Sequence, residues 1–177
     1  MLTQSRLREL LLYDPDSGVF TWRAHRCGPR TRGRRAGTVK GSRYRVISVD
    51  GRRYAASNLA WLYMTGEMPS KLVDHRNQNK IDDRWDNLRL ATRSQNVANT
   101  GPRANNACGI KGVSWDKKRS RWRAQIRREG FLKVTVHRTI EEAAASYQRM
   151  AAELYGEFAN RQSTQNSILD LYKAVTE

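Results

Sequence analysis

The sequence predicts an α+β protein made of two small units, the second of which is a three-stranded antiparallel sheet packed on one helix. Two observations carry this prediction. Short apolar stretches with the two-residue period of strands alternate with turn residues along the chain, and several stretches with helical spacing follow capping residues. With 177 residues, 38% of them hydrophobic, the chain can form one domain or two small ones with modest cores.

The N-terminal part predicts short elements joined by turns. Leucines at helical spacing predict a helix over Gln4–Tyr13, and Val19–Trp22 has the composition of a strand. Strand-like residues flank Asp50-Gly51, a dipeptide that strongly favours a hairpin turn. Ser57 is expected to cap a helix that ends at Gly66.

The chain is strongly basic, with 33 Lys and Arg residues against 17 Asp and Glu residues and a net charge of +16. Such an excess indicates a polyanionic partner. We expect a soluble, cytoplasmic protein with no membrane partner, because the sequence has no long apolar run and no signal peptide. The stretch 23–35 could be a merely solvated loop, but we favour a basic arm that contacts the DNA backbone through Arg30, Arg32, Arg34 and Arg35.

The stretch from Leu72 to Asn99 carries the candidate chemistry. A short apolar strand ends on Asp74-His75, a polar turn follows, and a second strand-like run leads into a capping box that predicts a helix start at Arg93. Arg93 and Asn96, three residues apart, would share one face of the first helical turn. Strand end, turn and helix start are therefore expected to converge on one polar patch.

This patch suits metal-assisted hydrolysis of a phosphodiester bond. The Asp74 carboxylate and the Asn96 amide offer hard oxygen ligands of the kind that Mg²⁺ prefers. A neutral His75 imidazole can accept a proton from the attacking water near neutral pH, and we expect Arg93 to clamp the phosphate. Because neighbouring strand residues point to opposite faces, Asp74 and His75 can serve one phosphate only where the strand ends.

The residues Val73-Asp74-His75, Asp83, Asp86-Asn87-Leu88-Arg89 and Thr92-Arg93-Ser94-Gln95-Asn96 resemble the HNH nuclease motif of phage and intron-encoded homing endonucleases. The resemblance implies a ββα-metal unit with Asp74 and Asn96 as metal ligands, His75 as general base and Asn87 as a brace for the loop. It also implies Mg²⁺, with Mn²⁺ as the alternative. The Ser57-Asn58 pair departs from the His-Arg that homing relatives often carry. No structural zinc is expected, because Cys27 and Cys108 lie far apart and are interpreted as free thiols rather than as a disulfide or a zinc site.

A second unit is predicted to follow a linker at 101–108, so that the nuclease domain covers 1–100 and the second domain 109–161. Arg121–Arg128 alternates between polar and apolar residues, as a half-buried strand does, and its polar face is almost wholly guanidinium. Thr139 with Glu142 forms a capping box for an alanine-rich helix. The segment 162–177 is predicted to form a short C-terminal helix whose role the sequence leaves open.

The pattern Gly112-Val113-Ser114-Trp115, Arg121–Ile126 and Thr139–Tyr147 resembles the plant ethylene-response-factor DNA-binding domain, which phage HNH nucleases often carry at the C-terminus. The resemblance implies a sheet that enters the major groove of double-stranded DNA. The expected DNA contacts are Lys111, Trp115, Arg121, Arg123, Gln125 and Arg127.

These observations favour a site-specific DNA endonuclease of homing type that leaves a 5′ phosphate and a 3′ hydroxyl. We expect a monomer with one site to nick a single strand, because the second strand presents its phosphate elsewhere. Two alternatives stay open: a DNA-binding regulator whose HNH-like unit is not catalytic, and an RNA-binding protein that contacts only the backbone.

Overall fold

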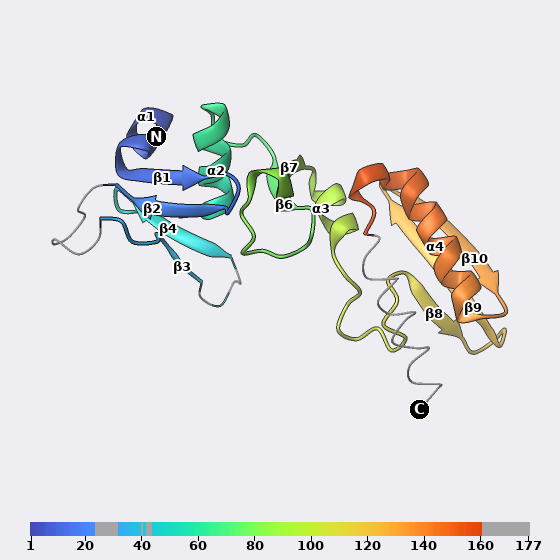
Figure 1. Ribbon diagram of the computed structural model, residues 1–177. Helices are drawn as coiled ribbons and strands as arrows, with labels where there is room; N and C mark the ends of the chain where they lie inside the picture. The colour runs from blue at the N-terminus through green and yellow to red at the C-terminus, as the bar shows by residue number, and fades with distance from the viewer. Residues whose placement is uncertain (24–31, 40, 42–43, 161–177) are drawn as a thin grey trace. The chain divides into compact units, whose positions relative to one another are not determined.

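The computed structural model describes residues 1–23, 32–39, 41 and 44–160, which form two compact units, Met1–Thr92 and Arg93–Glu177 (Figure 1). Three sequence predictions fall outside the described residues: the DNA contact of Arg30, the thiol of Cys27 and the helix at 162–177.

Among its described residues, the N-terminal unit contains three small antiparallel sheets, two α-helices and one short 3-10 helix. β1 pairs with β2, β3 to β5 form a three-stranded sheet, and β6 pairs with β7. The elements are α1 (Gln4–Leu10), β1 (Leu11–Asp14), β2 (Val19–Trp22), β3 (Thr38–Val39), β4 (Arg45–Val49), β5 (Arg52–Ala55), α2 (Ala56–Thr65), β6 (Leu72–His75), the 3-10 helix η1 (Trp85–Asn87) and β7 (Leu88–Ala91).

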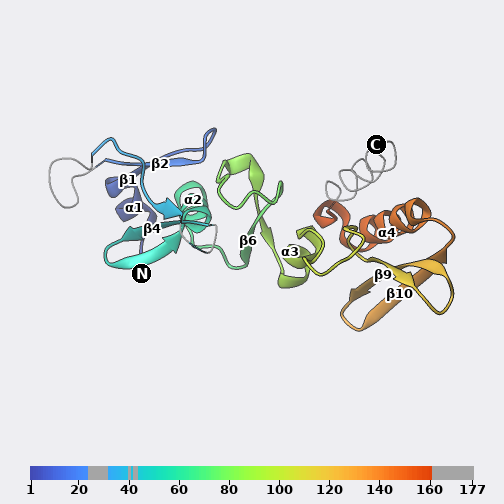
Figure 2. The same cartoon turned by 90° about the horizontal axis from the view of Figure 1, so that it is seen from below.

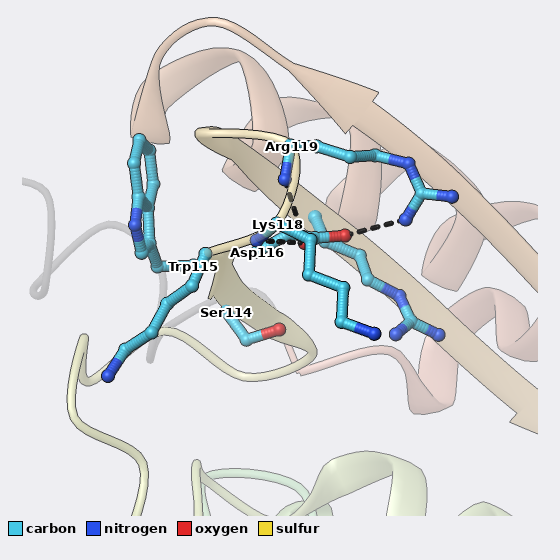
Figure 3. Close-up of a pocket in the computed structure, with 7 residues that line it drawn as sticks. Ser114, Trp115, Asp116, Lys118 and Arg119 are labelled. Carbon is cyan, nitrogen blue, oxygen red and sulfur yellow. Dashed lines mark hydrogen bonds and ion pairs between the residues drawn. The ribbon is translucent and has the colours of Figure 1, made fainter.

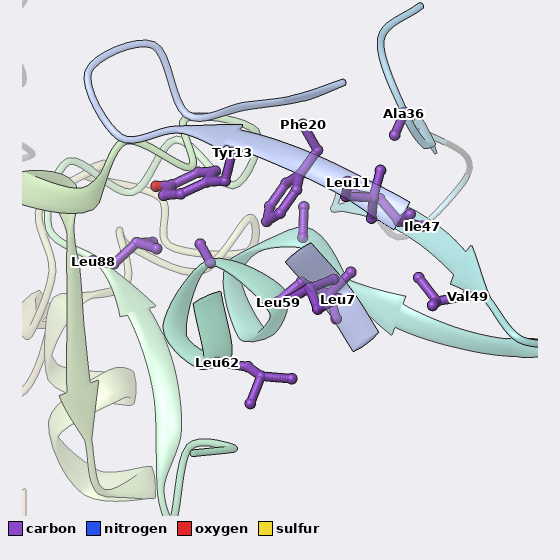
Figure 4. Packing of buried hydrophobic residues seen from close by; sticks show 12 residues of the cluster. Leu7, Leu11, Tyr13, Phe20, Ala36, Ile47, Val49, Leu59, Leu62 and Leu88 are labelled. Atoms are coloured by element: carbon purple, nitrogen blue, oxygen red, sulfur yellow. The ribbon is translucent and has the colours of Figure 1, made fainter. Parts of the chain in front are cut away.

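The core of this unit lies between the helices and the first two sheets (Figure 4). Leu7 of α1, Phe20 of β2, Ile47 of β4 and Leu59 of α2 are completely buried. The rings of Tyr13 and Phe20 stack with 4.7 Å between their centroids. The hydrophobic effect therefore ties together segments that are far apart in sequence, from Leu7 to Leu59.

Two local predictions for this unit are wrong. The helix predicted over Gln4–Tyr13 ends at Leu10, because Leu11–Asp14 pairs with β2 and alternates between buried and exposed side chains. Ser57 does not cap α2, whose N-cap is Ala55; Ser57 is buried in the first turn. The hairpin at Asp50-Gly51 and the end of α2 at Gly66 agree with the predictions.

The C-terminal unit is the predicted three-stranded antiparallel sheet with one long helix. Its elements are α3 (Arg93–Asn99), β8 (Val113–Asp116), β9 (Arg121–Arg128), β10 (Phe131–His137), α4 (Ile140–Tyr155) and the 3-10 helix η2 (Gly156–Phe158). The strand order is β10-β9-β8, and α4 lies along one face of the sheet (Figures 1 and 2). Ala124 and Ile126 of β9 and Ala143 and Tyr147 of α4 form its buried centre. Thr139 caps α4 by accepting a hydrogen bond from the Glu142 N–H, as the capping box predicts.

The boundary between the units differs from the predicted linker at 101–108. It falls at Thr92–Arg93, and the residues 101–108 belong to the C-terminal unit. Asn106 donates a hydrogen bond from Nδ2 to the carbonyl oxygen of Ile110 at 2.7 Å, and Asn160 donates one to the carbonyl oxygen of Thr100 at 3.1 Å. The first contact is local to the end of the segment, and the second joins the residue that precedes the segment to the end of the described chain.

The β1–β2 hairpin supports the loop that precedes β7. The Tyr13 hydroxyl donates a hydrogen bond to the carbonyl oxygen of Asp83 at 2.6 Å, and the Trp85 N–H donates one to the carbonyl oxygen of Pro15 at 2.9 Å. Burial raises the pKa of Tyr13 above its ordinary value. Gly18, at the hairpin turn, lies against the backbone of Asp83 and Arg84.

We predict that Gly18→Ala destabilises the N-terminal unit by about 3 kcal/mol, because a left-handed backbone and a steric clash act together. Gly18 has φ of +70°, and a Cβ there would lie 2.4 Å from the Arg84 nitrogen and from the Asp83 carbonyl carbon. Gly51→Ala is the matched control, since Gly51 has φ of +77° and open space around its Cβ position. Urea unfolding measures both; equal losses would contradict the steric argument.

Candidate active site

The candidate site is built on the β6–β7 hairpin. In the strand register, Asp74 lies opposite Arg89 and His75 lies opposite Leu88. Because successive strand residues point to opposite faces, Asp74 and His75 enter different environments. Both are almost fully buried at the end of β6.

Asp74 forms a buried ion pair with Arg89. The Arg89 Nε and Nη2 atoms both lie 2.9 Å from Asp74 Oδ2, and both residues are about 95% buried. A carboxylate in such a position is stable because the guanidinium supplies both charge and hydrogen bonds. The pair fixes the orientation of the carboxylate.

His75 forms a buried pair with Asp83. Its Nε2 atom lies 3.1 Å from Asp83 Oδ1, with only 3% and 2% of the two side chains exposed. The Tyr44 ring lies beside the imidazole, with 6.1 Å between centroids. The second Asp83 oxygen, Oδ2, is buried and has no hydrogen-bond partner among the described residues. A carboxylate on one ring nitrogen sets both the orientation and the tautomer of a histidine.

Asn87 holds the loop that carries Asp83. Its Oδ1 accepts a hydrogen bond from the Asn77 N–H at 3.0 Å, and its Nδ2 donates one to the Asp82 carbonyl oxygen at 2.7 Å. Asn77 also donates from Nδ2 to the Asp82 carboxylate. The hydrogen bond from Arg84 lowers the pKa of Asp82 to about 2. The loop thus has a fixed shape at both its ends.

Comparisons with known proteins find one protein family and two viral relatives. The model of the HNH endonuclease family matches residues 54–98. Protein 3.8 of Escherichia phage T7 is 36% identical over 100 residues, which cover 56% of this chain and 83% of the phage protein. An uncharacterized HNH endonuclease, L560, of Acanthamoeba polyphaga mimivirus is 36% identical over 100 residues, which cover 55% of this chain and 51% of the viral protein. The chain belongs to the HNH endonuclease family. No solved structure matches it.

Membership of the HNH family implies nuclease activity on DNA. The family match extends across the boundary between the two units, from β5 into α3. It therefore includes Arg93 and Asn96 as well as Asp74, His75 and Asn87.

The structure places these five residues in two groups. Asp74, His75 and Asn87 lie in the N-terminal unit, close to the β6–β7 hairpin. Arg93, which is exposed, and Asn96, which is half-buried, lie on α3 of the C-terminal unit. The convergence of Asn96 with Asp74 stays a prediction.

Two residues of the site were missed by sequence reasoning. Asp83 and Arg89 both stand within the HNH-like motif, but the sequence assigns no chemical role to either. The ion pair of Arg89 follows from the strand register, and the contact of Asp83 with His75 follows from the shape of the loop between β6 and β7. A local sequence pattern carries neither signal.

The C-terminal unit of this HNH protein has a basic sheet face. On β9, Arg121, Gln125 and Arg127 are exposed and Arg123 is half-buried, while Ala124 and Ile126 are buried under α4, as the alternation predicts. Trp115 is 47% exposed and contacts Trp122 edge to face, with 5.2 Å between centroids. In the N-terminal unit, Arg32, Arg34 and Arg35 are exposed.

Lys111 differs from its predicted role as a DNA contact. Its ammonium group donates hydrogen bonds to the carbonyl oxygens of Val97, Ala98 and Thr100 at 2.7, 2.7 and 2.8 Å. These are the last carbonyls of α3 and that of the residue that follows it, which have no hydrogen-bond partner within the helix itself. Lys111 is therefore a structural residue.

The described residues contain neither a membrane-spanning helix nor a cluster of acidic and imidazole ligands. Within the described ranges, no helix has the length and apolar content needed to cross a bilayer. In the same part of the chain, no three His, Cys, Asp or Glu side chains are grouped as metal ligands. The expected pair of metal ligands, the Asp74 carboxylate and the Asn96 amide oxygen, would not form such a group, because it contains only one of these four residue types. Cys108 is a free thiol.

We predict that Arg89→Met destabilises the N-terminal unit by about 3 kcal/mol, because the Asp74 carboxylate then loses its guanidinium partner while it stays buried. Urea unfolding followed by circular dichroism measures the loss. The double variant Asp74→Leu/Arg89→Met should recover much of it, since apolar replacement of both partners removes the buried charge. A double variant that is less stable than Arg89→Met alone would contradict this account.

We predict that Lys111 gives the C-terminal unit a pH-dependent stability. Burial lowers the pKa of Lys111 from 10.5 to about 8. Between these two values the unfolded chain binds the proton more tightly, so the contribution of Lys111 to stability rises with pH from 8 to 10.5. The free energy of unfolding of the wild type should therefore rise over this window relative to Lys111→Met. A difference between the two proteins that is constant with pH would refute the prediction.

Proposed function

We propose that the chain is a site-specific DNA endonuclease of homing type that hydrolyses one phosphodiester bond and nicks duplex DNA as a monomer. The observation that carries the proposal is the buried His75–Asp83 pair at the end of β6, next in sequence to the buried Asp74 carboxylate. A histidine oriented by a carboxylate is the arrangement that a general base requires.

The tautomer of His75 follows from its partner. We propose that the imidazole carries its proton on Nε2, where Asp83 accepts a hydrogen bond, so that Nδ1 is the nitrogen that acts as the base. We infer that Nδ1 takes a proton from the water molecule whose oxygen attacks phosphorus. The bond from phosphorus to the 3′ oxygen then breaks, which leaves a 5′ phosphate and a 3′ hydroxyl.

The donor set fits a divalent metal of the Mg²⁺ or Mn²⁺ kind. Asp74 offers a carboxylate and Asn96 an amide oxygen, both hard ligands, and such metals keep several waters. We propose that these two residues hold the metal, while Arg89 orients the Asp74 carboxylate in the way that hydrogen bonds orient ligating groups. When bound, the metal would stabilise negative charge on the phosphate and on the leaving oxygen.

The other residues position the reacting groups. Asn87 braces the loop on which Asp83 lies, so it acts on His75 only through that loop. The guanidinium of Arg93 is proposed to bind the phosphate.

The proposal predicts that the protein converts supercoiled plasmid carrying DNA of its source genome to open circles with Mg²⁺ and not with EDTA. His75→Ala should lose at least about a hundredfold in rate, the usual contribution of a general base. Because His75 is buried, His75→Gln is a second variant that keeps a donor for Asp83 and cannot act as the base. His137→Ala is the matched control: His137 lies at the end of β10 and contacts Thr135, and its loss should leave the cutting rate unchanged.

Three outcomes would contradict the proposal. Full activity of a folded His75→Gln variant would exclude the histidine as base. Linear product from single encounters, together with a dimer in gel filtration, would exclude nicking by a monomer. Plasmid binding without cleavage under either metal would favour the alternative, a DNA-binding regulator with a non-catalytic HNH unit.

A further inference from the structure

The face of the β9–β10 pair that points away from α4 has an apolar row beside its polar row. Leu132, Val134 and Val136 of β10 are 44%, 39% and 46% exposed, which is unusual for three alternate residues of one strand. The neighbouring row on β9 consists of guanidinium and amide side chains.

The contacts of the intervening residues show which way these side chains point. Thr135 Oγ1 lies 2.9 Å from Ser146 Oγ of α4, and Lys133 Nζ lies 3.1 Å from Glu153 Oε2 of the same helix. Thr135 and Lys133 therefore face α4. Because strand side chains alternate, Leu132, Val134 and Val136 face the opposite way.

The register places each apolar side chain opposite one donor side chain. Leu132 pairs with Arg127, Val134 with Gln125 and Val136 with Arg123. Directly opposite side chains have Cβ atoms about 5 Å apart, so each pair can contact the same small target. The outer face thus carries two parallel rows, with hydrogen-bond donors on β9 and methyl groups on β10. Each donor side chain lies opposite one apolar side chain, which makes three pairs.

The charge around this face points to DNA rather than to a protein partner. The β8–β9 turn at its edge forms a hollow of about 390 Å³ lined in part by Lys117, Lys118, Arg119 and Arg123 (Figure 3). The one carboxylate there, Asp116, is paired with Arg119 at 2.8 Å. Lysine and arginine side chains beside a surface that contacts bases are well placed to bind the backbone phosphates that border the groove.

The major groove displays the matching chemistry. An A·T base pair presents the adenine N7 and N6 groups, which a glutamine amide binds with two hydrogen bonds, and beside them the thymine methyl group, which takes an apolar contact. We propose that the outer face of β9 and β10 reads thymine methyl groups in the major groove, with Val134 and Gln125 acting together on one A·T base pair. The inference rests on the proposed DNA substrate and adds the class of base that is recognised.

Replacing thymine with uracil tests the contact directly, because uracil keeps every hydrogen-bonding group and lacks only the methyl. The full chain in EDTA is used to select duplexes from a random-sequence library, and the best duplex is remade with uracil at each thymine in turn. We expect the dissociation constant to rise about fourfold at each contacted thymine, the value for one buried methyl group. Equal affinity for the thymine and uracil duplexes would overturn the inference.

The protein side is tested with Val134→Thr, which keeps the shape of valine and replaces one methyl with a hydroxyl. It should weaken binding to the thymine duplex about fourfold and leave binding to the uracil duplex unchanged. Val39→Thr is the matched control, since Val39 is a strand valine of the N-terminal unit with 43% exposure. An equal effect of both variants, or of Val134→Thr on both duplexes, would overturn the inference.

The failures of the two proposals are distinguishable. A protein that cuts DNA but ignores the thymine methyl groups would keep the nuclease proposal and lose this one. A protein that binds thymine duplexes selectively but never cuts would do the reverse. Sedimentation that shows Val134→Thr abolishing a dimer, with DNA binding unchanged, would assign the face to a second copy of the chain instead.

Discussion

The contact between His75 Nε2 and Asp83 Oδ1 is the interaction on which the geometry of the candidate site depends. Both side chains are nearly fully buried, and an ionisable group in that position is stable only with a hydrogen-bonded partner. The loop between β6 and β7 must therefore bring Asp83 back to the strand end. The contacts of Asn87 and Tyr13 with the backbone of that loop achieve this.

Polar contacts also fix the register of the β6–β7 hairpin. Its apolar content is small: Leu72 is 49% exposed, and Leu88 and Ala91 are its buried hydrophobic residues. A slip of one residue would move every side chain to the other face, which would separate Asp74 from Arg89 and expose His75. The buried Asp74–Arg89 pair thus specifies one pairing of the strands, the role for which buried ion pairs are best attested.

The parts of the fold that could be predicted from sequence are those with a local physical cause. The left-handed turn at Asp50-Gly51, the alternation of Arg121–Arg128 and the capping of α4 by Thr139 each depend on residues within a few positions of one another. The strand Leu11–Asp14 could not be predicted, because its leucines match helical spacing and only the pairing with β2 overrides that preference.

The same distinction separates the predictable part of the site from the rest. Asp74, His75 and Asn87 stand at motif spacing, so the sequence alone proposes them as site residues. Asp83 and Arg89 acquire their contacts through a loop and a strand register, and Lys111 through the packing of the chain against the end of α3. For Lys111 a positive charge suggested a DNA contact, whereas three carbonyl acceptors within 2.8 Å assign it to the helix terminus.

Within the C-terminal unit, strand alternation separates the residues that fold the sheet from those that can read a ligand. Ala124 and Ile126 are buried under α4, whereas Gln125 and Val134 contribute little to that core. Strand stability does not require an exposed valine opposite an exposed glutamine, and exposed apolar side chains on an edge strand favour aggregation. A face that keeps three such residues among arginines is therefore better explained by a partner that offers both negative charge and methyl groups, as the major groove of DNA does.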